Sequence, residues 1–200
     1  FNEVKNLKAP LGKYGVLGNH DHDEVGADAT RLAMRAAGVK PIDNEGLWIW
    51  KGFQKIRLGG VGDLTYDQQD LKATLDPVKP NDYVILLSHQ PQYVDLINRA
   101  KVDLMLTGHT HGGQVIPTSQ VPINLGKLVK KNRVKGWMQV GPTTLLISRG
   151  LGSEFPYVRF LNQPQLHLIT LHHDPEAREI PAQPLTKEEK ENLELQNELQ

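Results

Sequence analysis

Three apolar runs in this chain each lead into a short polar loop that carries histidine, and this repeated pattern restricts the fold more than any other feature. The runs, each with its loop, are 14–17 with 18–23, 83–88 with 89–91, and 102–106 with 107–114. Short apolar runs of this kind are typical of strands buried in a sheet. In open α/β sheets, ligands bind beyond the carboxyl ends of the strands. The pattern therefore predicts an α/β fold whose imidazoles gather at one edge of the sheet.

Histidine is concentrated in these loops rather than spread along the chain. Five of the eight histidines lie in them, namely His20, His22, His89, His109 and His111. A single histidine after a strand is more often a hydrogen-bonded structural residue, but neutral imidazole is also the commonest metal ligand. The chain has no cysteine, so any metal ion is expected to be bound by nitrogen and oxygen atoms.

The second and third runs are joined by a helical pattern. Apolar residues at helical spacing over 93–100 separate the strand expected at 82–88 from the strand expected at 102–107. A strand, a crossover helix and a second strand form a βαβ unit, in which the two strands are parallel. This arrangement is expected to bring His89 and His109 to the same edge of the sheet.

Composition excludes some classes of function. The chain has 200 residues, 23 basic and 23 acidic side chains, and no net charge, whereas a general nucleic-acid binder needs a basic surface. No apolar run approaches the length that crosses a bilayer. We expect one domain over residues 1–173, followed by a polar tail or helix over 174–200. No nucleic-acid partner is expected.

Local patterns predict several further elements. A helix is expected over 28–37, with Asp28 as its N-cap and Gly38 closing it. The segments 47–50 and 55–59 are typical of a hairpin. A closing strand is expected at 166–171.

Three features leave two interpretations open. Asp63 follows a strand, so it either joins the site or forms an Asx turn, and we favour the turn. Arg149 lies between a strand and a glycine turn, where it either clamps a phosphate or forms a structural ion pair. The segment 127–135 is basic and partly apolar, which fits a solvated loop, or contact with an anionic membrane or an anionic substrate.

The loop motifs resemble those of the calcineurin-like metallophosphoesterases. The motifs are Gly18-Asn-His-Asp21, Ser88-His89 and Gly108-His-Thr-His111, and the resemblance runs from about residue 10 to residue 171. The His-Thr-His-Gly-Gly-Gln form and Ser148-Arg-Gly-Leu-Gly152 are similar to a bacterial subgroup of small, often membrane-associated phosphoesterases. Some of these relatives cleave the pyrophosphate of UDP-diacylglucosamine. The resemblance implies a β-sandwich flanked by helices (αββα).

The resemblance also implies a chemistry and a set of site residues. Two divalent transition-metal ions (Mn, Fe, Zn or Co) would clamp a phosphoryl group and activate water, so that a phosphodiester or pyrophosphate bond is hydrolysed. The implied roles are Asn19, His89 and His109 on the second metal, His111 on the first, His20 as general acid with Asp21 holding its other nitrogen, and Arg149 and Gln114 as substrate contacts.

The chain departs from the family pattern at its beginning. The Asp-x-His and Gly-Asp-x-x-Asp motifs are absent, because the 18 residues before Asn19 contain neither aspartate nor histidine. We expect the sequence to be the carboxyl-terminal part of a longer enzyme whose first strands lie upstream. The alternatives are that another chain supplies those strands, or that the protein is a non-catalytic metal-binding or scaffold relative.

The substrate and location follow only from the resemblance. A phosphorylated small molecule or a lipid-linked substrate is expected, with a possible peripheral contact to a membrane. A bacterial protein that is membrane-associated or cytoplasmic fits equally well. An unrelated zinc hydrolase is disfavoured, because His109 and His111 lack the helical spacing of the common protease motif.

Overall fold

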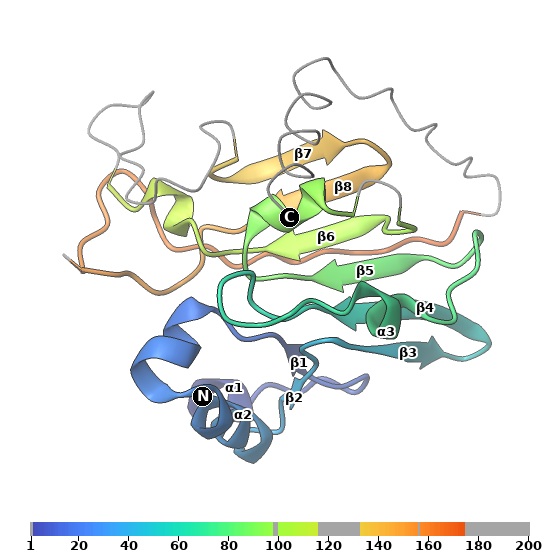
Figure 1. The fold of residues 1–200 in the computed structure, drawn as a ribbon, viewed down its shortest axis with the longest axis horizontal. Coiled ribbons are helices and arrows are strands. Elements are labelled where there is room, and N and C mark those ends of the chain that lie inside the picture. Colours follow the sequence, from blue (N-terminus) through green and yellow to red (C-terminus); the bar gives the residue numbers. More distant parts are fainter. Residues whose placement is uncertain (1, 98–99, 116–132, 156, 175–200) are drawn as a thin grey trace.

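The computed structural model describes residues 2–97, 100–115, 133–155 and 157–174. Its centre is a six-stranded sheet with the order β3-β4-β5-β6-β8-β7 (Figure 1). The strands are β3 (Glu45–Lys51), β4 (Gln54–Gly60), β5 (Val84–Leu87), β6 (Leu104–Thr107), β7 (Gly136–Val140) and β8 (Thr143–Ile147). The four inner strands are parallel to one another, and β3 and β7 are antiparallel edges. The predicted α/β class is confirmed.

The central strands β5 and β6 are almost entirely apolar because both faces of the sheet are covered there. On β5, Val84 and Leu86 pack into one hydrophobic cluster, while Ile85 packs into another. On β6, Met105 and Leu104 divide between the same two clusters. Successive side chains of a strand point to opposite faces, so a strand buried on both sides appears in the sequence as a continuous apolar run.

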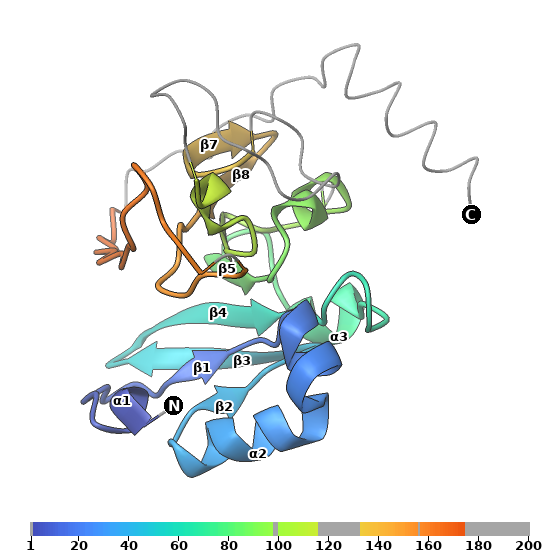
Figure 2. The same ribbon diagram turned by 90° about the vertical axis from the view of Figure 1, so that its left-hand side faces the viewer.

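A smaller layer lies beside β3. The strands β1 (Tyr14–Gly15) and β2 (Lys40–Pro41) form a two-stranded parallel sheet, and the helices α1 (Asn2–Lys5) and α2 (Ala27–Ala36) lie next to it (Figures 1 and 2). Short helical turns complete the described part: η1 (Asp21–Val25), α3 (Leu71–Leu75), η2 (Pro91–Asp95) and η3 (His111–Gly113). The four-layered sandwich stays a prediction.

Some local predictions were wrong. The N-cap of α2 is Gly26, and Asp28 lies in the first turn, where a carboxylate is favoured by the helix dipole. The crossover between β5 and β6 begins with a 3-10 turn at Pro91–Asp95 in place of a helix from residue 93. No strand forms over 166–171, and Leu166 and Leu168 are exposed there, so the apolar residues of this segment do not belong to the sheet.

Of the other predictions, two are confirmed and two concern residues that lie mostly outside the described part. The hairpin of β3 and β4 is confirmed, as is the parallel pairing of β5 with β6. The proposed tail lies almost entirely outside the described residues, as does the basic segment up to residue 132. Within the described part of the chain, no helix is long and apolar enough to cross a membrane.

Candidate metal centre

Three polar side chains from three different loops converge on one point. The amide Oδ1 of Asn19 lies 2.9 Å from Nε2 of His89, and that nitrogen lies 3.1 Å from Nδ1 of His109. Two ligands bound to one metal ion at about 2.0–2.1 Å lie about 3 Å apart. The three atoms therefore have the spacing of donors to a single cation, and they are three of the predicted ligands.

The sheet produces this convergence. Leu87 of β5 is paired with Leu106 of β6, so the loops that follow these neighbouring parallel strands leave the sheet side by side. The N–H of Gly108 donates to the carbonyl of His89 over 3.1 Å and ties the two loops together. The expected common edge for His89 and His109 is thus present.

Gly18 lets the first loop approach the other two. A Cβ atom added at Gly18 would lie 2.5–2.6 Å from three atoms of the His89 ring, which is closer than real contacts allow. Any larger residue at this position would push the His89 ring away from Asn19. The Gly-Asn-His-Asp motif therefore needs its glycine for packing as well as for its turn.

The third loop holds its residues in an unusual backbone conformation. His109, His111 and Gln114 have φ values of 67°, 49° and 43°. This left-handed region costs residues other than glycine of order 1–3 kcal/mol each, and such residues cluster at functional sites. Gly112, between them, also has positive φ, at 64°. Local strain thus marks the loop on which two of the predicted ligands lie.

The two converging histidines are poised in the form that binds metal. Burial, together with the charge of neighbouring His109, lowers the pKa of His89 to about 4. Burial also lowers the pKa of His109, although the charges of Glu154 and Asp63 oppose the shift. Both imidazoles are therefore neutral near pH 7, with a lone pair available for a cation.

The converging donors form a single group of two imidazoles and one amide. Within the described residues, no group of three histidine or acidic side chains can hold a metal, because the third donor near His89 and His109 is the Asn19 amide. His111 is occupied differently, since its Nδ1 lies 3.2 Å from Oε1 of Gln114. The described residues bring three potential donors together, and their role as ligands of one ion stays a prediction, as does the role of His111 on another ion.

His20 has a different environment from these histidines. Its Nδ1 lies 2.8 Å from Oε1 of Glu24, and its Nε2 pairs with Oε1 of Glu154. Burial is the largest influence on the His20 pKa and lowers it, but the hydrogen bonds and charges of Glu154 and Glu24 together raise that pKa above its usual value. A protonated imidazole is the form that acts as a general acid.

The structure changes the partner assigned to His20. Glu24 takes the place at Nδ1 that the resemblance gives to Asp21. The Asp21 carboxylate instead accepts a hydrogen bond of 2.8 Å from the N–H of Gly18. Asp21 therefore stabilises the loop that carries Asn19 through this backbone hydrogen bond.

Gln114 and Arg149, the predicted substrate contacts, both support loops. The buried Gln114 amide donates to the Glu154 carbonyl over 2.9 Å and accepts from the Glu154 N–H over 2.8 Å. The Arg149 side chain packs on Gly112, where an added Cβ would lie 2.5 Å from its Cγ, and its Nε donates to Gln165 over 3.1 Å. Direct contact of either residue with a substrate stays a prediction.

A second arginine joins the segment after β8 to the histidine loop. Arg159 donates to the carbonyl of His111 over 3.2 Å and to that of Arg149 over 2.8 Å. The Asn162 amide also donates to the His111 carbonyl, over 2.6 Å. Sequence reasoning missed Glu24, although it lies only four residues after His20. It also missed Glu154 and Asn162, because their partners His20 and His111 lie 134 and 51 residues away and no local pattern connects them.

The structure bears on two of the features that had more than one interpretation, Asp63 and the basic segment 127–135. Asp63 is fully buried and forms the expected Asx turn, accepting from the N–H of Thr65 over 2.8 Å. Its other oxygen accepts from the Gln90 amide over 2.6 Å. Arg133, at the end of the basic segment, is buried in a 2.5 Å ion pair with Asp95, so this one basic residue is structural.

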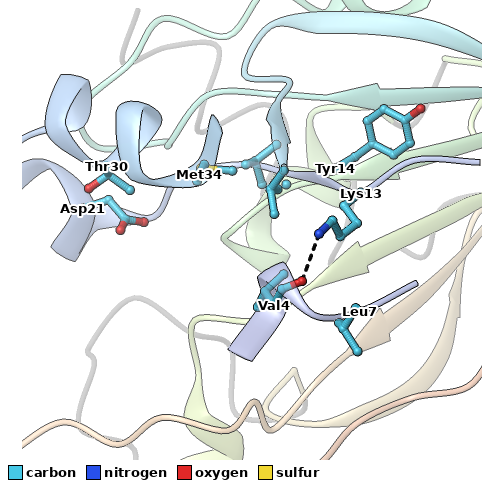
Figure 3. A pocket seen from close by; sticks show the side chains of 10 residues that line it. Val4, Leu7, Lys13, Tyr14, Asp21, Thr30 and Met34 are labelled. Atoms are coloured by element: carbon cyan, nitrogen blue, oxygen red, sulfur yellow. Dashed lines mark hydrogen bonds between the residues drawn. The ribbon is translucent and has the colours of Figure 1, made fainter. Parts of the chain in front are cut away.

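A pocket of about 400 Å³ lies away from the converging donors, between α1, β1 and α2 (Figure 3). Its lining is mostly apolar, with Lys13, Asp21 and Thr30 as polar members. The Lys13 ammonium is already used: it donates to the carbonyls of Val4 and Ala37 over 3.0 and 2.9 Å. None of Asn19, His89 and His109 lines this pocket.

Comparisons with known proteins agree with this geometry. The family model described as calcineurin-like phosphoesterase matches residues 1–113. The uncharacterized metallophosphoesterase YkuE of Bacillus subtilis is 33% identical over 84% of this chain and 59% of its own length. An uncharacterized metallophosphoesterase of Aquifex aeolicus is 32% identical, over 84% of this chain and 64% of its own.

The relatives include one with a named activity. The phosphodiesterase YaeI of Escherichia coli is 27% identical over 86% of this chain and 64% of its own length. The chain thus spans about three fifths of the length of these relatives. No solved structure matches it significantly.

Proposed function

This chain belongs to the calcineurin-like phosphoesterase family, and on that premise we propose that it provides one metal site and the general acid of an enzyme that hydrolyses a phosphodiester or pyrophosphate bond. The family implies metal-dependent phosphoester hydrolysis. The observation that carries the proposal is the convergence on His89 Nε2, which lies 2.9 Å from Asn19 Oδ1 and 3.1 Å from His109 Nδ1.

The chain's own residues have distinct tasks in this proposal. Asn19, His89 and His109 hold one divalent ion, with His111 beside them. When bound, divalent ions supply Lewis-acid activation of the phosphoryl group and of the attacking water. His20 donates a proton from Nε2 to the leaving oxygen, and Glu24 keeps the imidazole oriented through Nδ1.

A binuclear centre is the finer part of the proposal. It would use Mn, Fe, Zn or Co, because imidazole and amide or carboxylate oxygens suit these ions. His111 would serve the first ion together with the Asp-x-His and Gly-Asp-x-x-Asp motifs. Those motifs are absent from the 200 residues, so these residues alone do not complete the first site.

A non-catalytic metal-binding or scaffold role is the alternative function. It is favoured by one observation: the Asp-x-His and Gly-Asp-x-x-Asp motifs of the family are absent from the 200 residues. A protein of this kind would bind one ion at the three converging donors and turn over no phosphoester.

We further propose a phosphorylated small molecule or a lipid-linked phosphoester as substrate. The segment that follows Arg149 and contains Glu154 exposes several large apolar side chains: Leu151, Phe155, Tyr157, Phe160 and Leu161. Exposed apolar clusters are typical of surfaces that meet lipid or another apolar partner. Sedimentation with anionic vesicles tests the lipid arm, since a Phe155→Ser, Tyr157→Ser variant should lose binding. Unchanged sedimentation of the variant, or none by the wild type, would count against it.

The proposed function is tested by metal content together with hydrolysis of bis(p-nitrophenyl) phosphate in the presence of manganese. We expect the 200-residue chain to bind one ion, and a form extended upstream to bind two ions and hydrolyse the diester. His89→Ala should lose the ion, whereas His172→Ala, which removes an exposed histidine, should keep it. Metal binding without turnover by the extended form would favour the non-catalytic alternative.

A further inference from the structure

Glu154 brings a negative charge to the place where the proposed reaction needs the leaving ester oxygen of the substrate. Its Oε1 pairs with Nε2 of His20, while Glu24 occupies Nδ1 of the same ring. In the proposed function, Nε2 is the atom that donates a proton to the leaving oxygen. Substrate and Glu154 therefore compete for one hydrogen-bond donor.

The backbone of Glu154 is fixed while its side chain keeps some freedom. The buried Gln114 amide makes two hydrogen bonds to the backbone of Glu154, of 2.9 and 2.8 Å. Gly152, two residues before Glu154, accepts a hydrogen bond from Arg159 at its carbonyl. The Glu154 side chain is 39% exposed and that of His20 is 46% exposed, so the carboxylate has room to turn away from the ring.

A carboxylate that is displaced from Nε2 stays close to the bound substrate, because the Gln114 hydrogen bonds keep its backbone in place. Like charges repel more strongly as their charges increase. A phosphodiester, or each phosphorus of a disubstituted pyrophosphate, carries one negative charge. A phosphomonoester carries close to two near pH 8, so it meets greater repulsion from the same carboxylate.

From this geometry we infer that Glu154 is a specificity-determining residue that discriminates against phosphomonoesters in favour of phosphodiesters. The inference rests on the proposed function. It assigns to one residue the preference of that reaction for diesters over monoesters. Glu154 acts by repulsion of the disfavoured substrate, which is a common way to obtain specificity. Gln114 is the positioning residue that holds the charge in place.

The test compares kcat/KM for bis(p-nitrophenyl) phosphate and p-nitrophenyl phosphate in the upstream-extended protein with manganese, at pH 8. Glu154→Gln should lower the diester-to-monoester ratio about tenfold, mainly through a lower KM for the monoester. Glu24→Gln is the matched control, because it removes the same charge from the other nitrogen of His20. It should lower kcat for both esters and leave the ratio unchanged.

Binding of unreactive analogues gives a second readout that needs no turnover. Phenylphosphonate is a dianion near pH 8, and its monoethyl ester is a monoanion. We expect Glu154→Gln to bind phenylphosphonate about tenfold more tightly than the wild type does, and to change the affinity for the monoethyl ester much less. Calorimetry on the metal-loaded protein measures both affinities. Glu154→Ala should behave like Glu154→Gln, which separates loss of charge from loss of a hydrogen bond.

The outcomes separate this inference from the function on which it rests. Equal changes for both esters in Glu154→Gln, or the same change of ratio in Glu24→Gln, would overturn the role of Glu154 and leave the phosphoesterase proposal standing. Absence of hydrolysis of either ester by the extended wild type would overturn the proposed function. In that case the inference would be overturned as well if Glu154→Gln bound each phosphonate with the same affinity as the wild type.

Discussion

His89 and His20 are the same amino acid, each in a loop that follows a strand, yet they have opposite environments. His89 is largely buried, its nearest polar neighbours are an amide oxygen and another imidazole, and its pKa is lowered to about 4. His20 is half exposed between two carboxylates, and its pKa is raised. In the proposed function, the neutral ring binds a cation and the other ring carries a proton.

The difference shows that the charges near a histidine, rather than the residue type, decide which protonation form it favours. Burial without a counter-charge favours the neutral imidazole, whereas two nearby carboxylates favour the imidazolium even where burial opposes it. Pairs of titratable groups whose environments separate their pKa values are a common basis for assigning roles in catalysis.

The largest effect is expected from removing the proton donor. His20→Gln should lower the rate of diester hydrolysis by the extended protein about 10²–10⁴-fold. Metal content should not change, because His20 is not one of the converging donors. Loss of metal together with activity would show that His20 belongs to the metal site, and the contrast between the two histidines would fail.

The pH dependence of stability should reveal the environment of His89 in metal-free protein. Its folded-state pKa, about 4, is below the value of about 6.5 in the unfolded chain. The folded state therefore binds fewer protons between these values, so stability is full above pH 6.5 and falls as pH drops toward 4. The loss should reach about 3 kcal/mol.

Urea unfolding at pH 7 and at pH 4.5, with a chelator present, measures this loss. His89→Gln should remove most of the difference between the two pH values. His172→Gln, at an exposed position, should keep it. The same difference in wild type and His89→Gln would mean that other groups cause it.

A smaller effect is expected from Gly18, the residue that lets Asn19 approach His89. Gly18→Ala places a Cβ atom 2.5 Å from the His89 ring and should destabilise the fold by about 1–3 kcal/mol. It should also weaken metal binding, which titration calorimetry with Mn²⁺ or Zn²⁺ measures. Gly152→Ala is the matched control, because an added Cβ there has no neighbour within 4 Å. Equal metal affinities in the two variants would contradict the packing argument.

The smallest effect concerns the second carboxylate at His20. Glu24→Gln should lower the pKa of His20, because one of the two charges that raise it is removed. The base limb of the pH–rate profile, where the acid loses its proton, should then move to lower pH. An unchanged limb would show that Glu24 does not act on the proton donor.

The sequence predicted the central part of the fold because parallel strands buried on both faces leave a strong apolar signal. The pairing of β5 with β6, and with it the meeting of His89 and His109, follows from that signal. Strand β7 lies in a stretch with a weak signal, since its side chains alternate between exposed and half-buried. The strand expected at 166–171 is the reverse case, in which an apolar segment has no sheet pairing.

The partners of the site were harder to predict than its donors. Asn19, His89 and His109 belong to short motifs, so each could be recognised from neighbouring residues. The pairing of Glu154 with His20 joins residues 134 positions apart and depends on how the Gln114 amide holds a distant loop. Contacts of this kind follow from tertiary structure and leave no local pattern.

The most direct test of the metal centre is long-range ¹H–¹⁵N NMR of the imidazole nitrogens while Zn²⁺ is added to the 200-residue chain. We predict that His89 Nε2 and His109 Nδ1 shift together at one equivalent, with His20 changing little. Zinc-induced shifts confined to other histidines, or no shift at His89 and His109, would contradict the claim that these loops form a metal site.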